Sequence, residues 1–72
     1  MKRKNRISEH KILIDGVTGK PFEKAQEIAK SNGYSVRVIR RDQENFIVTF
    51  DLNFWRINFE VDNNIITRAS IG

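Results

Sequence analysis

The 72-residue sequence contains no cysteine, so it can form no disulfide bond, offers no thiolate nucleophile and has no cysteine ligand for zinc. It has one proline, and no run approaches the ~20 apolar residues of a membrane-spanning helix. A chain this short buries only about 60% of the surface that its unfolded form exposes, so a small core must hold the fold by packing alone. Its apolar and charged fractions, 39% and 31%, are typical of an ordinary globular domain.

The net charge of +4 comes entirely from the start of the chain. Residues 1–11 contain five Lys or Arg and one Glu, whereas residues 12–72 contain eight basic and eight acidic side chains. We predict a basic, flexible N-terminal arm over 1–11, because chain ends are usually poorly ordered, and a folded domain over 12–72. Basic segments can contact nucleic acids or membrane surfaces, but this arm is too short for the phosphate contacts of tight binding, which favours a solvated leader.

No secretory signal follows the basic start, because no apolar run of the required length precedes Gly16. If the chain is complete, this absence predicts a cytoplasmic protein. A leader removed earlier would leave the same sequence, so the compartment stays open.

Few residues are suited to catalysis. The single histidine, His10, lies in the basic arm and is interpreted as an exposed side chain without a special role. The carboxylates Asp42, Glu44 and Asp51 have spacings that fit no metal-loop motif, so we interpret them as solvated loop charges. The sequence therefore predicts a protein that is not an enzyme, with no catalytic residue, no metal site and no cofactor.

Hydrophobic spacing predicts one helix, over about residues 21–32. Pro21 suits the first helical position, where its missing N–H costs nothing, and Gly33 suits the position after the last turn. The apolar side chains of this segment recur at helical spacing: Phe22, Ala25, Ile28 and Ala29. The apolar patch at 12–14 ends at a turn signal, and it is interpreted as a short edge strand or as a segment that packs against the core.

Alternating apolar and polar residues predict three strands, at 34–40, 56–61 and 65–70. The second strand places three apolar side chains on one face: Ile57, Phe59 and Val61. Asn63-Asn64 can adopt the positive φ angles that a tight hairpin requires. The last two strands are therefore predicted to be antiparallel neighbours.

The fifteen residues 41–55 form a connection that is longer than a hairpin needs. A connection between parallel strands requires a dozen residues or more, and Val48, Thr49 and Phe50 favour extended geometry. Loops of this length in compact domains are usually functional or disordered, and the apolar composition argues against disorder. The length of this connection therefore fits a crossover between parallel strands better than a hairpin.

Five segments occur in a fixed order along residues 18–72: Thr18-Gly19-Lys20, Val36–Arg40, Val48–Leu52, Arg56–Asp62 and Ile71-Gly72. In this order they resemble the potato inhibitor I family of serine protease inhibitors, including its bacterial branch. They are similar to the entry to the family's helix, its first sheet strand, its reactive-site loop, its second strand and its hydrophobic-Gly terminus.

This resemblance implies an α+β fold, with a single helix packed on a small mixed β-sheet and a long extended binding loop joining two parallel strands. It also implies that the protein inhibits serine proteases with a substrate-like loop. It implies that the reactive loop that enters the protease cleft consists of Val48, Thr49, Phe50, Asp51 and Leu52. Phe50 would fill the primary specificity pocket, with Phe50–Asp51 as the scissile bond, and Thr49 and Asp51 would hydrogen-bond to arginines of the second strand. An aromatic residue here predicts a chymotrypsin-like or subtilisin-like target rather than a trypsin-like one, whose pocket takes Lys or Arg.

The segment after the scissile bond departs from the family pattern. Arg56 and Asn58 are the expected loop supports. Asn58 stands where a second arginine is common in the family, and an Asn at this position resembles the bacterial branch. Phe54 and Trp55 stand where the family usually has a more polar or turn-forming pair. Either one of these aromatics folds under the loop and shields the core, or they are exposed anchors for a protein partner or for self-association.

Three hypotheses for the function remain open. The first is a serine protease inhibitor acting through Phe50. The second is a protein-binding module of the same fold, active inside the cell, that uses the loop with Phe54 and Trp55 to bind a partner other than a protease. The third, with the least support, is a nucleic-acid-associated protein that works through the arm. We expect a monomer or weak homodimer with a protein partner and no membrane association.

Overall fold

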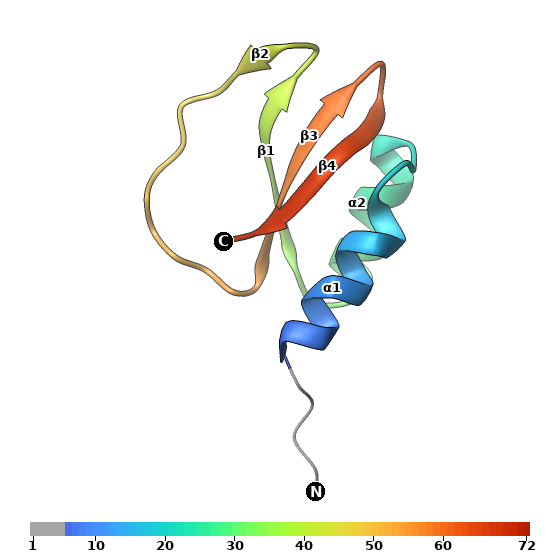
Figure 1. Ribbon diagram of the computed structural model, residues 1–72, viewed down its shortest axis with the longest axis vertical. Coiled ribbons are helices and arrows are strands. Elements are labelled where there is room, and N and C mark those ends of the chain that lie inside the picture. The colour runs from blue at the N-terminus through green and yellow to red at the C-terminus, as the bar shows by residue number, and fades with distance from the viewer. Residues whose placement is uncertain (1–5) are drawn as a thin grey trace, which may run out of the picture.

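The computed structural model describes residues 6–72, with side chains from residue 8 onward. It contains two helices and a four-stranded mixed sheet (Figure 1). In chain order these are α1 (Arg6–Val17), α2 (Phe22–Ser31), β1 (Ser35–Arg41), β2 (Glu44–Asn45), β3 (Arg56–Asp62) and β4 (Ile65–Ile71). The predicted α+β class is confirmed, but the expectation of a single helix is wrong, because α1 precedes the predicted helix.

The strands lie in the order β2-β1-β3-β4. β1 and β3 pair in parallel, with Ser35 beside Arg56, whereas the β1–β2 and β3–β4 pairs are antiparallel. The long connection between parallel strands and the antiparallel final pair are therefore both confirmed. In the final turn, Asn63 and Asn64 have φ angles of 50° and 64°, the left-handed geometry of a type I′ hairpin.

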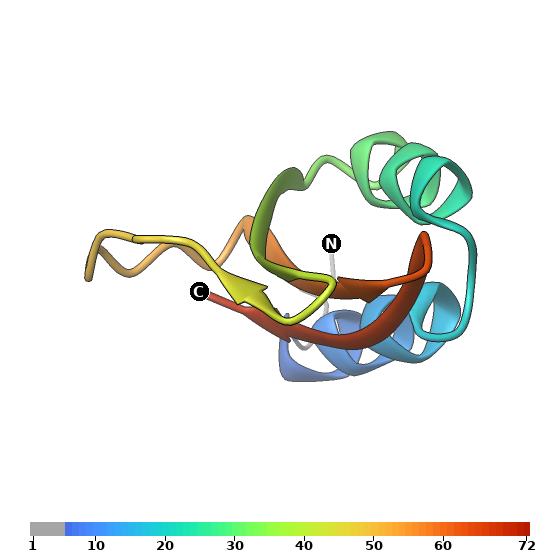
Figure 2. The same ribbon diagram turned by 90° about the horizontal axis from the view of Figure 1, so that it is seen from above.

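The core lies between the helices and one face of the sheet. α2 contacts β1 and β4, and α1 contacts β4 and α2. The three side chains that the alternation of β3 predicted to point inward are buried: Ile57, Phe59 and Val61. The ring of Phe22 from α2 meets that of Phe59 edge-on, with 6.2 Å between their centroids. Figure 2 shows the long loop projecting from the side of the molecule that lies away from the helices.

α2 lies where the sequence predicted a helix. Pro21 directly precedes its first residue, and Gly33, with a φ angle of 84°, follows the capping residue of its last turn. The amide of Asn64 donates a hydrogen bond to the carboxylate of Glu23 over 3.1 Å, which ties the first turn of α2 to the β3–β4 hairpin. The same hydrogen bond lowers the pKa of Glu23 below its ordinary value.

α1 occupies the segment where the sequence predicted an edge strand or a packed coil at 12–14. The helix also includes residues 6–11 of the predicted arm. Leu13 and Val17, one helical turn apart, are buried in the core, whereas Ile12 is 71% exposed. α1 therefore depends on tertiary packing, which its local sequence pattern does not reveal. The rest of the predicted arm, residues 1–5, lies outside the described residues.

Candidate functional site

The connection between β1 and β3 begins with a tight hairpin that the sequence did not predict. Asp42 and Gln43 turn the chain with φ angles of 49° and 71°, and β2 returns beside β1. The backbone N–H of Phe46 donates to the carbonyl of Ile39 over 3.0 Å. The Asp42 carboxylate accepts a hydrogen bond from the backbone N–H of Asn63 over 2.9 Å, so this turn is attached to the β3–β4 turn. Neither turn residue is glycine, and the sequence signal for a positive-φ turn is correspondingly weak.

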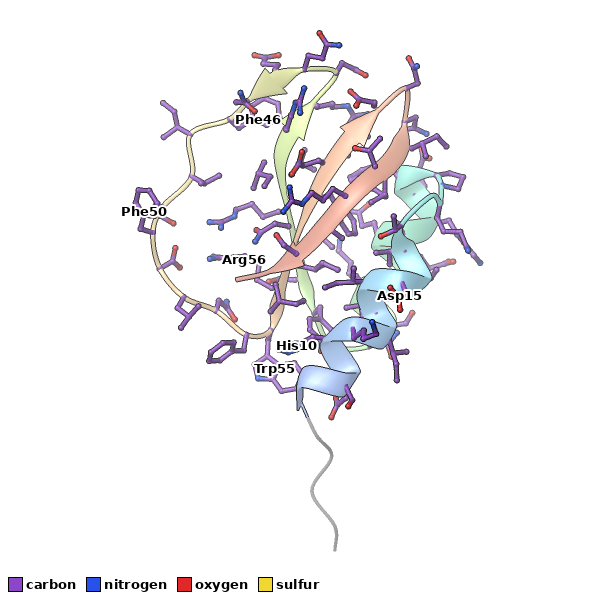
Figure 3. All side chains as sticks on the ribbon, viewed as in Figure 1. His10, Asp15, Phe46, Phe50, Trp55 and Arg56 are labelled. Atoms are coloured by element: carbon purple, nitrogen blue, oxygen red, sulfur yellow. The ribbon has the colours of Figure 1, made fainter. Side chains whose placement is uncertain are left out.

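Residues 46–55 then leave the sheet in an extended curve, which we call the arc (Figure 1). The arc exposes large apolar side chains along most of its length: Phe46, Ile47, Phe50, Leu52, Phe54 and Trp55. Phe50 and Ile47 are as exposed as in a free peptide, at 105% and 103%. In Figure 3, Phe50 lies at the outer edge of the arc. Large apolar side chains exposed along one segment are typical of a site that contacts another molecule.

Arg56, the first residue of β3, supports the arc from within. Its guanidinium donates to the backbone carbonyl of Asp51 over 2.8 Å and to the carboxylate of Asp51 over 3.2 Å. Its Nε donates to Gly72 O over 2.9 Å, which fixes the guanidinium against the end of β4. Figure 3 shows Arg56 between the arc and the sheet. The structure thus brings together Asp51 and Arg56, two of the residues that the sequence placed in the site.

A second arginine, Arg37 of β1, supports the arc from the neighbouring strand. Its Nη1 donates to the carbonyl of Thr49 over 3.5 Å and lies 3.9 Å from the carboxylate of Asp51. Its Nε donates to Asn58 Oδ1 over 2.9 Å, and its Nη2 donates to Gly72 O over 3.4 Å. The sequence predicted supporting arginines from the second strand only, but Arg37 lies in β1. Only the parallel register places it beside Asn58.

Asn58 supports the arc indirectly. It is buried in β3, where its Oδ1 accepts from Arg37 and its Nδ2 donates to Gly72 O over 2.9 Å. Among the described residues, no hydrogen bond joins Asn58 to the arc, so its expected role as a direct loop support needs correction. Asn58 orients Arg37, whose longer side chain reaches the arc.

The tip of the arc is held on both sides of Phe50. The Thr49 hydroxyl donates a short hydrogen bond to the Asp51 carboxylate, which also accepts from Arg56. These two hydrogen bonds, with that from Thr49 contributing most, lower the pKa of Asp51 from the ordinary 3.8 to about 2. Asp51 therefore stays ionised at neutral pH. Outside this tip, Val48 is half-buried and Leu52 is exposed.

The arc returns to the sheet through a cluster of aromatic rings. Phe54 stacks on His10 of α1, with 6.3 Å between the centroids, and Trp55 lies 5.3 Å from Tyr34. His10 also meets Tyr34 edge-on at 5.9 Å. Phe54 and Trp55 remain 47% and 41% exposed, so each is covered on one side only. His10 was expected to be exposed in the arm, but it is half-buried because α1 carries it onto this cluster.

The described part of the chain has neither a group of side chains suited to a metal ion nor a helix suited to a membrane span. Within it, no three His, Asp or Glu side chains gather so as to hold a metal ion. Neither α1 nor α2 is long and apolar enough to cross a membrane. The arc and its two arginines therefore provide the most developed candidate site of the described residues.

Comparisons of the chain with protein-family models, with curated proteins and with solved structures found no match. The fold and the site define the protein by its structure. It is an α+β domain that displays an extended apolar arc, with Arg37 and Arg56 attaching the tip of the arc to the sheet.

Proposed function

We propose that the protein inhibits serine proteases by presenting Phe50 to the primary specificity pocket of a chymotrypsin-like or subtilisin-like enzyme. The observation that carries the proposal is an exposed aromatic side chain on a backbone that is attached to the sheet on both sides. Thr49 and Asp51 flank Phe50, and they accept hydrogen bonds from Arg37 and Arg56. The resemblance to the potato inhibitor I family supports the same assignment.

The support of the tip matters because an inhibitor must bind the protease without being rapidly cleaved and released as a substrate is. A loop that already has its bound shape loses less conformational entropy on binding, so more of the contact energy appears as affinity. A large aromatic side chain in a fitted pocket is a common hot spot, where truncation costs ~2 kcal/mol or more of binding free energy. Ile47 and Leu52, which are also exposed, extend the apolar contact surface on either side of Phe50.

Titration of chymotrypsin, subtilisin and trypsin with the purified protein tests the proposal. We expect stoichiometric loss of chymotrypsin or subtilisin activity and no effect on trypsin, whose pocket takes a basic side chain. Phe50→Gly should abolish the inhibition, Phe50→Tyr should retain it, and Phe50→Lys should transfer it to trypsin. The proposal fails if micromolar protein leaves chymotrypsin and subtilisin active and is itself digested after Phe50.

A second candidate is a module that binds a protein other than a protease through the end of the arc. The exposed halves of Phe54 and Trp55 favour it, because half-exposed aromatics are frequent anchors at protein interfaces. A second copy of the chain is the simplest such partner to test. Size-exclusion chromatography would then show a concentration-dependent mass that Trp55→Ala abolishes and Phe50→Gly leaves unchanged.

A further inference from the structure

The two ends of the arc are held by different means. At the start, β2 pairs with β1, and the Phe46 N–H bonds to Ile39, so backbone hydrogen bonds fix the chain. At the end, the hydrogen bonds of Asn53 within the described residues are local: its side-chain oxygen accepts from the Trp55 N–H over 2.9 Å, and its carbonyl accepts from the Arg56 N–H over 3.3 Å. This end is attached to the rest of the domain by a backbone hydrogen bond from Ser35 to Trp55 and by ring contacts.

The rings that contact the end of the arc come from segments far away in the sequence. Phe54 lies against His10 of α1, and His10 lies against Tyr34, a buried residue that directly precedes β1. Trp55 packs on the same Tyr34, and its carbonyl accepts from the Ser35 N–H over 2.8 Å. Through His10, α1 thus contacts the part of the arc that follows Phe50 (Figure 3).

We infer that α1 is a positioning element for the arc, and that His10 holds residues 51–55 in place when the Phe50–Asp51 bond is opened by a protease. This inference rests on the proposed function and adds to it a residue outside the loop. It assigns His10 no contact with the protease and no part in proton transfer. His10 is a positioning residue that acts through Phe54.

The chemistry explains why residues 51–55 need holding. The serine oxygen of the protease attacks the carbonyl carbon of Phe50, and the Phe50–Asp51 bond breaks with its electron pair on the Asp51 nitrogen, which takes up the serine proton through the enzyme's base. The nitrogen is then a free amine, and the enzyme carries an ester to Phe50. If the amine stays in place, its lone pair attacks the ester carbon, the amide re-forms and the proton returns to the serine. If residues 51–55 move away, water hydrolyses the ester.

Several attachments can hold the amine after cleavage. Arg56 keeps its hydrogen bonds to the carbonyl and carboxylate of Asp51, since neither group is consumed. The Trp55 carbonyl keeps its hydrogen bond from the Ser35 N–H. The ring contact of Phe54 with His10 lies between these two attachments and restricts the segment further.

The environment of His10 indicates that its ring surface, rather than its imidazole chemistry, matters here. Its Nε2 is buried, and the described residues provide no hydrogen-bond partner for it. A buried polar atom without a partner is unfavourable, so an apolar ring of similar shape should fit the position at least as well. This predicts that His10→Phe preserves the effect that His10→Ala removes.

The test uses the full chain, cut once after Phe50. The cut chain is incubated with a catalytic amount of active chymotrypsin or subtilisin, whichever the protein inhibits. The ratio of re-formed to cut chain at equilibrium is measured by mass spectrometry, together with the rate of cleavage of intact chain. We expect His10→Ala to lower this ratio and to speed cleavage by about threefold to tenfold, the range of one aromatic pair. His10→Phe should match the unmodified chain within about twofold. If His10→Ala does not fold, His10→Leu takes its place, since it retains apolar bulk without a flat ring.

Ile66→Val is the matched control, because Ile66 is buried near the opposite end of the sheet and loses only one methylene. It should lower the unfolding temperature without changing the ratio. The inference is overturned if His10→Ala leaves the ratio unchanged while the unmodified chain inhibits, or if Ile66→Val changes it equally. If the unmodified chain inhibits neither protease, the proposed function fails and this inference fails with it.

Discussion

The inner face of β3 and the arc carry similar side chains in opposite environments. Ile57 and Phe59 of β3 are completely buried, whereas Ile47 and Phe50 of the arc are completely exposed. Burying a large apolar side chain contributes ~1.5–3 kcal/mol to folding, so Ile57 and Phe59 stabilise the domain, whereas Ile47 and Phe50 do not. The arc takes its shape from hydrogen bonds to arginines, which leaves its apolar surface available for a partner.

The contrast between buried side chains of β3 and exposed side chains of the arc leads to the prediction with the largest expected effect. Phe59→Ala should lower the free energy of unfolding by about 3–5 kcal/mol, because it opens a cavity in the core of a small domain. Phe50→Ala, the same change in the arc, should alter it by no more than about 0.5 kcal/mol. Urea unfolding followed by circular dichroism measures both. Equal losses would show that the arc packs on the core.

Removal of the main support of the arc should separate binding from stability. Arg56→Ala leaves the Asp51 and Gly72 oxygens without their shortest guanidinium contacts, so we expect about ten- to a hundredfold weaker inhibition of chymotrypsin or subtilisin. Arg56→Lys should restore little of this loss, because an ammonium group cannot reproduce the fork of donors. Unchanged inhibition by Arg56→Ala would mean that the arc holds its shape without Arg56.

The two arginines should differ in importance. The contacts of Arg37 with the arc are 3.5 and 3.9 Å long, against 2.8 and 3.2 Å for Arg56, so Arg37→Ala should weaken inhibition by about two- to fivefold only. Asn58→Ala should have a similar effect, because Asn58 orients Arg37. Inhibition constants for the two single variants and the double variant measure this, and fully additive losses would contradict the dependence of one residue on the other.

The smallest effect concerns pH. The pKa of Asp51 is about 2 in the folded chain against 3.8 ordinarily, so its stabilisation of the tip is fully present above about pH 4 and is lost as the pH falls to about 2. The carboxyl carbon signal of Asp51 in a nuclear magnetic resonance titration should have its midpoint near pH 2. Thr49→Val should raise that midpoint, since the Thr49 hydroxyl is the main cause of the shift. A midpoint near 3.8 in the unmodified chain would show that the carboxylate is free.

The sequence predicted those elements whose own residues determine them. The alternation in 56–61, the Asn63-Asn64 turn and the helix between Pro21 and Gly33 all appear in the structure close to their predicted bounds. The parallel arrangement of β1 and β3 agrees with the length of the 41–55 connection and with the fold that the family resemblance implies. For the other three elements a local pattern is sufficient evidence.

The missed features depend on contacts between distant segments. α1 has apolar residues around most of its circumference, and only its docking shows that Leu13 and Val17 form the buried side. A possible signal was the spacing of His10, Leu13 and Val17, which is that of successive helical turns. The role of Arg37 needed the strand register, and the contact of His10 with Phe54 needed the position of α1. No pattern within one segment contains that information.

The most direct test of the central claim is the state of the chain after contact with a protease. Equimolar protein and subtilisin, or chymotrypsin, are incubated for hours, and residual activity is measured together with the masses of the recovered chain. The supported arc predicts that activity is lost and that the chain is recovered intact or with one cut, after Phe50. Full activity and a chain digested to small peptides would contradict the claim that the arc presents Phe50 as an inhibitor.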